Sequence, residues 1–184
     1  MLREKTLKNF VHFQYLLVGL LFLLVVLTIF GSTADAKKKI NACELLTLEN
    51  AEAMLAEKAE KRVGFPKNME FASGKIINSR CYYDAISSNR MVGLNITFRP
   101  NASYPKTLDE YIEVSKSEMG SSNEALKKAI SVPGVGDFAV WTESWGVGTL
   151  NVYWKDYKIL ILTSDDKQGI ESAKTLANKV IKKL

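Results

Sequence analysis

The stretch that decides the fold is residues 148–163, GTLNVYWKDYKILILT. Leu150, Val152 and Trp154 alternate with other side chains in the period-two pattern of a half-buried β-strand. A polar turn, KDYK, follows, and the closing run KILILT is apolar on both faces. We therefore expect a β-hairpin whose second strand lies in the centre of a sheet.

The segment just before this hairpin, SVPGVGDFAVW at residues 131–141, combines two glycines with an aspartate. A similar pattern binds phosphate when a strand precedes the glycines and a helix follows them. Here the expected order is helix, glycines, strand. We therefore interpret the glycines as a structural turn with unusual backbone angles, in which the aspartate bonds local amides. The turn residues are Pro133, Gly134, Gly136 and Asp137.

Periodicity also places the other elements along the chain. Strands are predicted in residues 75–86, 91–99 and 138–143, and helices in residues 47–62, 107–120 and 168–184, with a helical turn in residues 124–130. The order is α-β-β-α-β-β-β-α, and most strands are joined by hairpin-like spacings. We predict an α+β fold in which an antiparallel sheet of about five strands packs against helices.

Residues 1–36 are typical of an export segment. A basic start is followed by the uncharged run 15–30 and by the small-x-small motif ADA, which a signal peptidase recognises. The run is shorter than the about 20 residues of a usual membrane span. Two outcomes stay open: cleavage after Ala36, or an uncleaved hydrophobic helix that anchors the chain in the membrane through residues 10–30. In both, the remainder is exported: it is periplasmic or secreted after cleavage, and anchored to the membrane if the helix is retained.

The composition beyond the export segment indicates one globular domain. The chain has 184 residues, of which 47% are hydrophobic and 24% charged. We assign residues 37–42 to a short basic linker and residues 43–184 to a single extracytoplasmic domain. The net charge of +5 is scattered over the sequence. Scattered charge favours a solvated surface and argues against nucleic-acid binding.

Cys43 and Cys81 are the only cysteines of the chain. Both follow the export segment, and an oxidising compartment favours a disulfide between them. A metal pair would need companion ligands, and the sequence has no CxxC redox motif. We therefore predict a Cys43–Cys81 disulfide.

Residues suited to catalysis are scarce. The single histidine, His12, lies in the export segment, which removes Ser-His-Asp, Cys-His and imidazole-metal chemistry from the exported domain. Ser164 and Lys167 have S-x-x-K spacing, but they follow a predicted strand and lack the partner motifs. We predict no catalytic residue, no metal and no cofactor. The alternative is a hydrolase without histidine, based on carboxylates or on a Ser/Lys pair.

Aromatic side chains gather near the last three predicted strands. They are either core and turn residues, or a surface for a protein partner or an apolar ligand. Trp145 is the best candidate for binding, because it lies in a predicted turn where burial is hardest. The candidate binding residues are Trp145, Trp141, Tyr153 and Tyr157.

Several short motifs resemble an uncharacterised family of small bacterial exported proteins and lipoproteins, typical of actinobacterial envelopes. They span about residues 42–184 and comprise CELLT, AEA, CY, GVGD and LNVYWKDYKILI. The resemblance implies a cysteine pair and an α+β sandwich akin to the PsbP/Mog1-like fold, which is not mainly enzymatic. This chain lacks the lipid-modified cysteine that such proteins often carry after the apolar run.

Taken together, these observations predict a non-enzymatic, exported cell-envelope domain that binds a protein partner or an apolar ligand. A structural accessory subunit of an envelope complex is a further alternative, beside the hydrolase.

Overall fold

A computed structural model describes residues 40–63, 68–70, 77–119, 124–163 and 168–184. The export segment predicted in residues 1–36 lies outside these residues. Residues 40–184 form one compact unit. Ile40 and Ala42 are buried in its core. No helix within the described ranges is long and apolar enough to cross a membrane.

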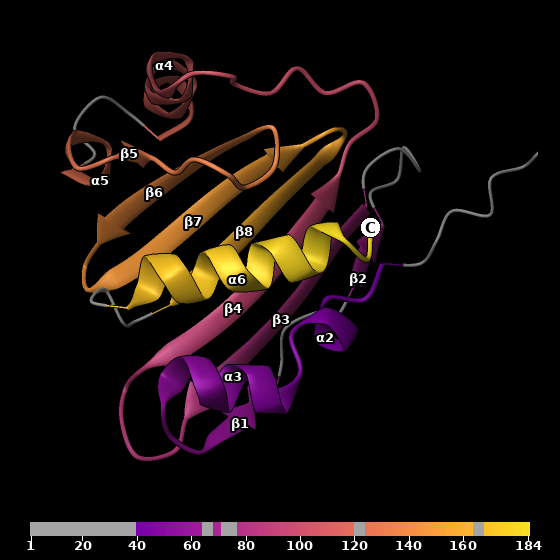
Figure 1. Cartoon of the computed structure of the whole chain (residues 1–184), viewed down its shortest axis with the longest axis vertical. Helices are drawn as coiled ribbons and strands as arrows, with labels where there is room; N and C mark the ends of the chain where they lie inside the picture. The colour runs from indigo at the N-terminus through magenta and orange to yellow at the C-terminus, as the bar shows by residue number, and fades with distance from the viewer. Residues whose placement is uncertain (1–39, 64–67, 71–76, 120–123, 164–167) are drawn as a thin grey trace, which may run out of the picture. The chain divides into compact units, whose positions relative to one another are not determined.

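An antiparallel sheet of eight strands runs through the domain (Figure 1). Its order is β1-β3-β4-β8-β7-β6-β5, and β2 pairs with β3 outside this path. The strands are β1 (Ala59–Lys61), β2 (Asn68–Glu70), β3 (Ile77–Ala85), β4 (Met91–Phe98), β5 (Ile130–Ser131), β6 (Phe138–Ser144), β7 (Val147–Trp154) and β8 (Tyr157–Thr163). The antiparallel α+β fold is confirmed, but about five strands was too few. The additional strands β1, β2 and β5 are too short to show alternation in the sequence.

Helices cover both faces of this sheet. They are α2 (Ala42–Leu45), α3 (Leu48–Leu55), α4 (Leu108–Met119), α5 (Glu124–Lys127) and α6 (Gly169–Ile181). Helices α2, α3 and α6 lie on one face, the α6 face, as Figure 1 shows. Helices α4 and α5 pack on the opposite face, the α4 face, through a second group of buried side chains.

The strand β8 is the fourth of the seven strands in the main path, between β4 and β7. Ile159 and Ile161 point to the α6 face and are fully buried, while Leu160 and Leu162 point to the α4 face and are half-buried. The predicted central position of this strand is therefore confirmed. A strand with neighbours on both edges and helices on both faces needs apolar side chains on each side.

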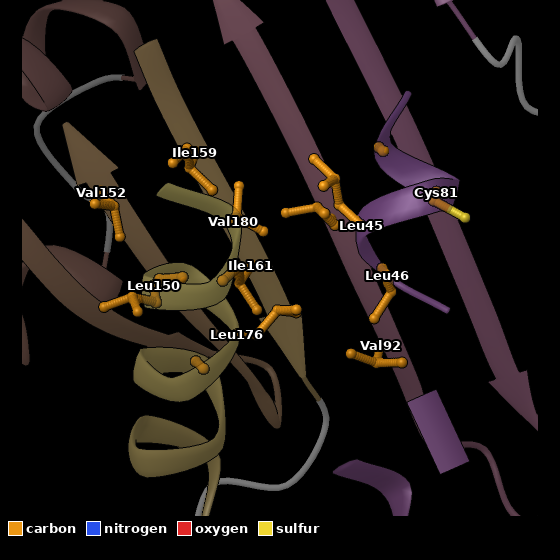
Figure 2. Packing of buried hydrophobic residues seen from close by; sticks show 14 of the residues in the cluster. Leu45, Leu46, Cys81, Val92, Leu150, Val152, Ile159, Ile161, Leu176 and Val180 are labelled. Carbon is orange, nitrogen blue, oxygen red and sulfur yellow. The ribbon is translucent and has the colours of Figure 1, made fainter. Parts of the chain in front are cut away.

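The main core fills the space between the sheet and α6 (Figure 2). Leu176 and Val180 of α6 face Leu150 and Ile161 of the sheet in this view. Each fully buried aliphatic side chain contributes about 1.5–3 kcal/mol relative to an exposed one. The predicted apolar stripe of the last helix is thus the surface that fastens it to the sheet.

The first predicted helix, residues 47–62, is wrong in its last part. Helix α3 ends at Leu55, and the next residue, Ala56, has a left-handed φ of 55°. Residues 59–61 then form β1, which pairs with β3 from Ala85 to Tyr83. The segment has good helix formers. Its pairing with the edge of β3 satisfies the hydrogen bonds of its backbone and outweighs that local preference.

Candidate functional site

A cavity of about 430 Å³ lies between α4 and the α4 face of the sheet. We call it the α4 cavity. Its lining combines three tyrosine rings, several hydroxyl and amide groups, and a few aliphatic side chains. This volume is within the range of small-molecule sites in proteins.

Strand register builds the floor of the cavity. Tyr153 on β7 lies opposite Lys158 on β8, and Lys158 lies opposite Thr97 on β4. In the next row along the strands, Asn151 lies opposite Leu160. Because side chains alternate along a strand, all five residues face α4 rather than α6.

The roof is made by α4 and by the loop before it. The helix is capped by Thr107, whose hydroxyl oxygen accepts a hydrogen bond from the Glu110 amide at 3.2 Å. Tyr111, Ser115 and Glu118 follow at helical spacing and line the cavity from one face of the helix. Tyr111 and Ser115 are buried, so α4 holds its polar side chains against the sheet.

A buried polar cluster joins the roof to the floor. The Asn151 side-chain amide donates to the Tyr111 hydroxyl at 3.4 Å. Burial raises the pKa of Tyr111, and hydrogen bonds with Ser115 and Thr142 partly oppose that rise. Buried polar groups persist when they are bonded to one another, so this cluster fixes the distance between α4 and β7.

The Tyr153 ring is the aromatic centre of the cavity. It stacks on Phe138 with ring centroids 6.2 Å apart and contacts Tyr104 at 5.1 Å. The residue is only 5% exposed, and its hydroxyl has no hydrogen-bond partner among the described residues. Burial is the main cause that raises the pKa of Tyr153, so the phenol is neutral and keeps its proton as a donor.

Three charged side chains line the same cavity: Arg99, Glu118 and Lys158. The Lys158 ammonium lies 5.7 Å from the centroid of the Tyr153 ring. Nearby, the Tyr104 hydroxyl donates to the Asp156 carbonyl at 3.3 Å. The site therefore presents two cations and one carboxylate around neutral hydroxyl groups.

No protein-family model, no curated protein and no solved structure matches this chain. The resemblance to exported envelope proteins therefore stays a prediction. Within the described ranges, no group of three or more His, Cys, Asp or Glu side chains is placed to hold a metal ion.

The structure separates the aromatic residues that the sequence grouped as candidate binding residues. Trp141 is 1% exposed and points to the α6 face, where its ring lies against Gly148 and Gly169, so it is a core residue. Tyr157 is half-buried and packs against Phe98 with ring centroids 5.1 Å apart. Of the four candidate binding residues, only Tyr153 lines the α4 cavity.

Trp145 is 100% exposed at the tip of the β6–β7 hairpin. Both residues of this turn have positive φ, 56° for Trp145 and 76° for Gly146, as a type I′ turn requires. The structure therefore places Trp145 in a turn and outside the core, as the sequence predicts.

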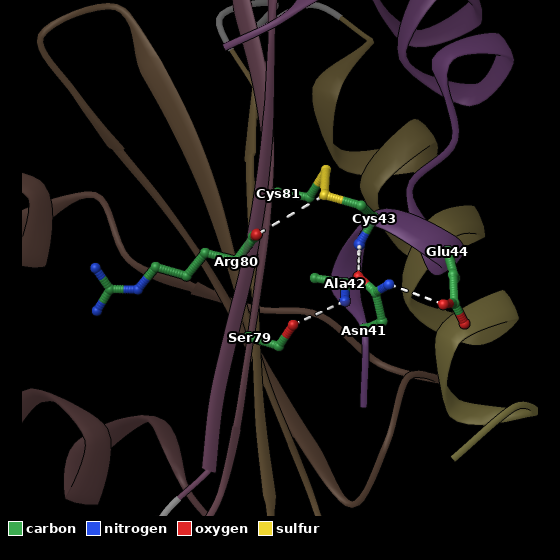
Figure 3. Close-up of a disulfide and its surroundings, with 7 residues drawn as sticks. All are labelled: Asn41, Ala42, Cys43, Glu44, Ser79, Arg80 and Cys81. Carbon is green, nitrogen blue, oxygen red and sulfur yellow. Dashed lines mark hydrogen bonds between the residues drawn. A yellow bond between two sulfur atoms is a disulfide. The ribbon is translucent and has the colours of Figure 1, made fainter. Parts of the chain in front are cut away.

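The predicted Cys43–Cys81 disulfide is present, with Cα atoms 5.1 Å apart (Figure 3). It joins α2 to the middle of β3. Beside it, the Ala42 amide donates to the Ser79 hydroxyl at 2.8 Å. Figure 3 shows the Arg80 side chain leaving the opposite side of the strand, so the disulfide belongs to the α6 face and does not reach the cavity.

The sequence reasoning missed Tyr111, Asn151 and Thr142 as site residues. Neither the helical spacing of Tyr111 nor the alternating position of Asn151 in a strand indicates a site by itself. The available signal was the spacing of Tyr111, Ser115 and Glu118, which places polar groups beside an apolar stripe. Ser164 and Lys167, the rejected S-x-x-K pair, lie outside the described residues.

A second cavity of about 330 Å³ lies between α3 and α6. Its lining is largely apolar and includes Met54 and Leu176. The Lys179 ammonium donates to the Asn50 side-chain carbonyl across it at 2.9 Å. Because its lysine is bonded within the protein, this cavity offers fewer open polar groups than the α4 cavity.

Proposed function

We propose that this protein is a non-enzymatic, exported binding domain that takes a small ligand in the α4 cavity. The observation that carries the proposal is the Tyr153 side chain, which is only 5% exposed, lines a cavity of about 430 Å³ and makes no hydrogen bond through its hydroxyl within the described ranges. A phenol hydroxyl that faces a cavity can donate its proton to a ligand that lies there.

The mixed lining supports this proposal and modifies the expectation of a purely apolar ligand. Aliphatic side chains such as Leu126 and Leu160 alternate with hydroxyl groups around the cavity. Small-molecule sites usually combine apolar walls with a few polar groups that orient the ligand. An amphiphilic ligand fits such a lining better than a hydrocarbon does.

An extracytoplasmic location is part of the same proposal. It rests on the export segment in the sequence and on the Cys43–Cys81 disulfide, which is compatible with an oxidising compartment. Whether residues 1–36 are removed is tested by the mass of the mature protein. A mass that begins after Ala36 supports cleavage, and an intact Met1 supports an anchor.

Native mass spectrometry of the exported protein tests the cavity. We expect a retained small molecule, and Thr149→Phe should remove it because the larger side chain fills the cavity from the β7 floor. Val147→Phe is the matched control, since it makes a similar change on the same strand outside the cavity lining. Equal retention by both variants would count against the α4 cavity as the site.

A second candidate function is protein binding through Trp145. A fully exposed tryptophan at a hairpin tip is unusual for a surface without a partner, and tryptophan is frequent among the residues that dominate interfaces. Trp145→Ala should reduce capture of envelope proteins, whereas Val63→Ala, at another highly exposed apolar residue, should not. Equal capture by both variants would rule against this surface.

A further inference from the structure

We propose that the ligand of the α4 cavity is a small organic monoanion, such as a carboxylate with a compact ring-sized body, whose charged end lies beside Lys158 and Arg99. This inference rests on the proposed function, because it names the class of ligand that the same cavity takes.

The first step of the argument is the balance of charge. Two cations and one carboxylate line the cavity, which leaves an excess of one positive charge. The salt bridges found among the described residues involve neither Arg99 nor Lys158. A single negative charge on the ligand would balance this excess, whereas a cation would add to it.

The second step is the placement of the two cations on one side of the cavity. Lys158 lies opposite Thr97 on β4, and Arg99 follows Thr97 by two residues. The Arg99 amide still donates to the Asp156 carbonyl at 2.9 Å, so the backbone pairing with the β7–β8 turn continues to this residue. Both side chains reach the cavity from neighbouring positions at one end of the floor.

The third step is the supply of hydrogen-bond donors. Tyr153 lies directly opposite Lys158, and its neutral hydroxyl is a donor without a protein acceptor among the described residues. Hydrogen bonds in which one partner is charged are about twice as strong as neutral ones. An anionic oxygen beside Lys158 could accept from the ammonium and from this hydroxyl together.

The fourth step concerns the body of the ligand. The rings of Tyr104 and Tyr153 are 5.1 Å apart and offer an aromatic surface beside the charged end. Pro105, Val114 and Leu126 add aliphatic contacts on the roof side. These walls favour an apolar ring, because a ring can pack against them. A fully hydrated ion such as inorganic phosphate would make no apolar contact with them.

Fluorescence titration of the full chain with two probes of equal shape tests this inference. The probes are 2-naphthoate, an anion, and 2-naphthamide, its neutral counterpart. We expect 2-naphthoate to bind at least tenfold more tightly, because only it carries the charge. Lys158→Gln and Arg99→Gln should each reduce this preference for 2-naphthoate over 2-naphthamide by about fivefold to tenfold.

Lys155→Gln is the matched control variant. It removes one positive charge from the β7–β8 turn, where Lys155 is exposed and outside the cavity lining. We expect this variant to change the 2-naphthoate affinity by less than twofold. Tyr153→Phe should weaken 2-naphthoate by about threefold or more, because it removes the donor and keeps the ring.

The outcomes separate this inference from the proposed function. Equal binding of both probes, lost in Thr149→Phe, would overturn the monoanion and keep the cavity as a binding site. Tight 2-naphthoate binding that Lys155→Gln weakens as much as Lys158→Gln would also overturn it, since general surface charge would then explain the preference. Failure of both probes, with no retained small molecule, would overturn the inference and the proposed function together.

Discussion

The Asp137 carboxylate accepts a hydrogen bond from the backbone amide of Lys155 at 2.7 Å. The Asp137 amide in turn donates to the Tyr153 carbonyl at 2.8 Å. These two bonds tie the glycine turn before β6 to the end of β7, across 18 residues of sequence. The sequence predicted that Asp137 bonds local amides, but its carboxylate accepts from an amide that is distant in the sequence, that of Lys155.

The Asp137 bond should contribute to stability rather than to ligand binding. Asp137→Ala removes the acceptor of the Lys155 amide and should lower the free energy of unfolding by about 1–2 kcal/mol. Asp137→Asn keeps an oxygen acceptor and should recover part of this loss. Urea denaturation measures both values. An unchanged midpoint in Asp137→Ala would show that water replaces the carboxylate without cost.

Gly148 should not tolerate a side chain. A Cβ atom added there would lie 2.3 Å from the buried Trp141 ring, which Gly169 also contacts from α6. Gly148→Ala should therefore lower the free energy of unfolding by about 1–3 kcal/mol through overpacking. Gly134→Ala is the comparison, since its Cβ meets nothing within 4 Å and only its positive φ opposes the change. A smaller loss at Gly148 than at Gly134 would contradict this packing.

The conformation of the β6–β7 turn leads to a prediction about the stability of a Trp145 variant. Its φ of 56° suits asparagine better than tryptophan, and Asn-Gly is the preferred pair in such turns. Trp145→Asn should keep or raise the free energy of unfolding, by up to about 1 kcal/mol. Thermal unfolding measures this change. A marked loss of melting temperature would mean that the exposed ring stabilises the fold.

The disulfide should account for a large share of the stability. It closes a loop with a sequence separation of 38, for which the chain-entropy model gives about 3–4 kcal/mol. Denaturant unfolding with and without a reductant should show this difference. A variant with both Cys43→Ser and Cys81→Ser should unfold like the reduced protein and should not respond to the reductant.

Stability should fall with rising pH above about 10, where tyrosine ionises in unfolded chains. Burial raises the pKa of Tyr153 in the folded protein. The unfolded chain therefore loses this proton first, and the folded state binds more protons, so the free energy of unfolding decreases as pH rises. One tyrosine whose pKa is raised by folding lowers the free energy of unfolding by up to about 1.4 kcal/mol per pH unit.

Comparison of the wild type with Tyr153→Phe isolates this contribution, since the half-buried Tyr104 and the buried Tyr111 also have raised pKa values. The variant should lose less stability between pH 10 and pH 11, values chosen from the ordinary tyrosine pKa of about 10. Parallel curves for the two proteins would contradict the burial of this hydroxyl.

The elements that could be predicted from the sequence are those with a long repeating pattern. The strands around Cys81, Leu94 and Leu150 show alternation, and the last helix has a continuous apolar stripe. The short strand β1 could not be predicted, because residues 59–61 favour a helix locally and become a strand only by pairing with β3. For the same reason the cavity was missed: its polar residues come from elements that are distant in the sequence.

By itself, the sequence determined the α+β class, the order of the main elements, the β7–β8 hairpin and the cysteine pair. Each depends on local periodicity, on turn residues or on the chemistry of one residue type. Tertiary structure alone decided that β4 pairs with β8, which joins the two halves of the sheet. That pairing sets Thr97 beside Lys158 and Tyr153 in one row, and the packing of α4 over this row forms the cavity. Its physical reason is burial: the apolar positions of both strands face the same core, and their pairing removes both from water.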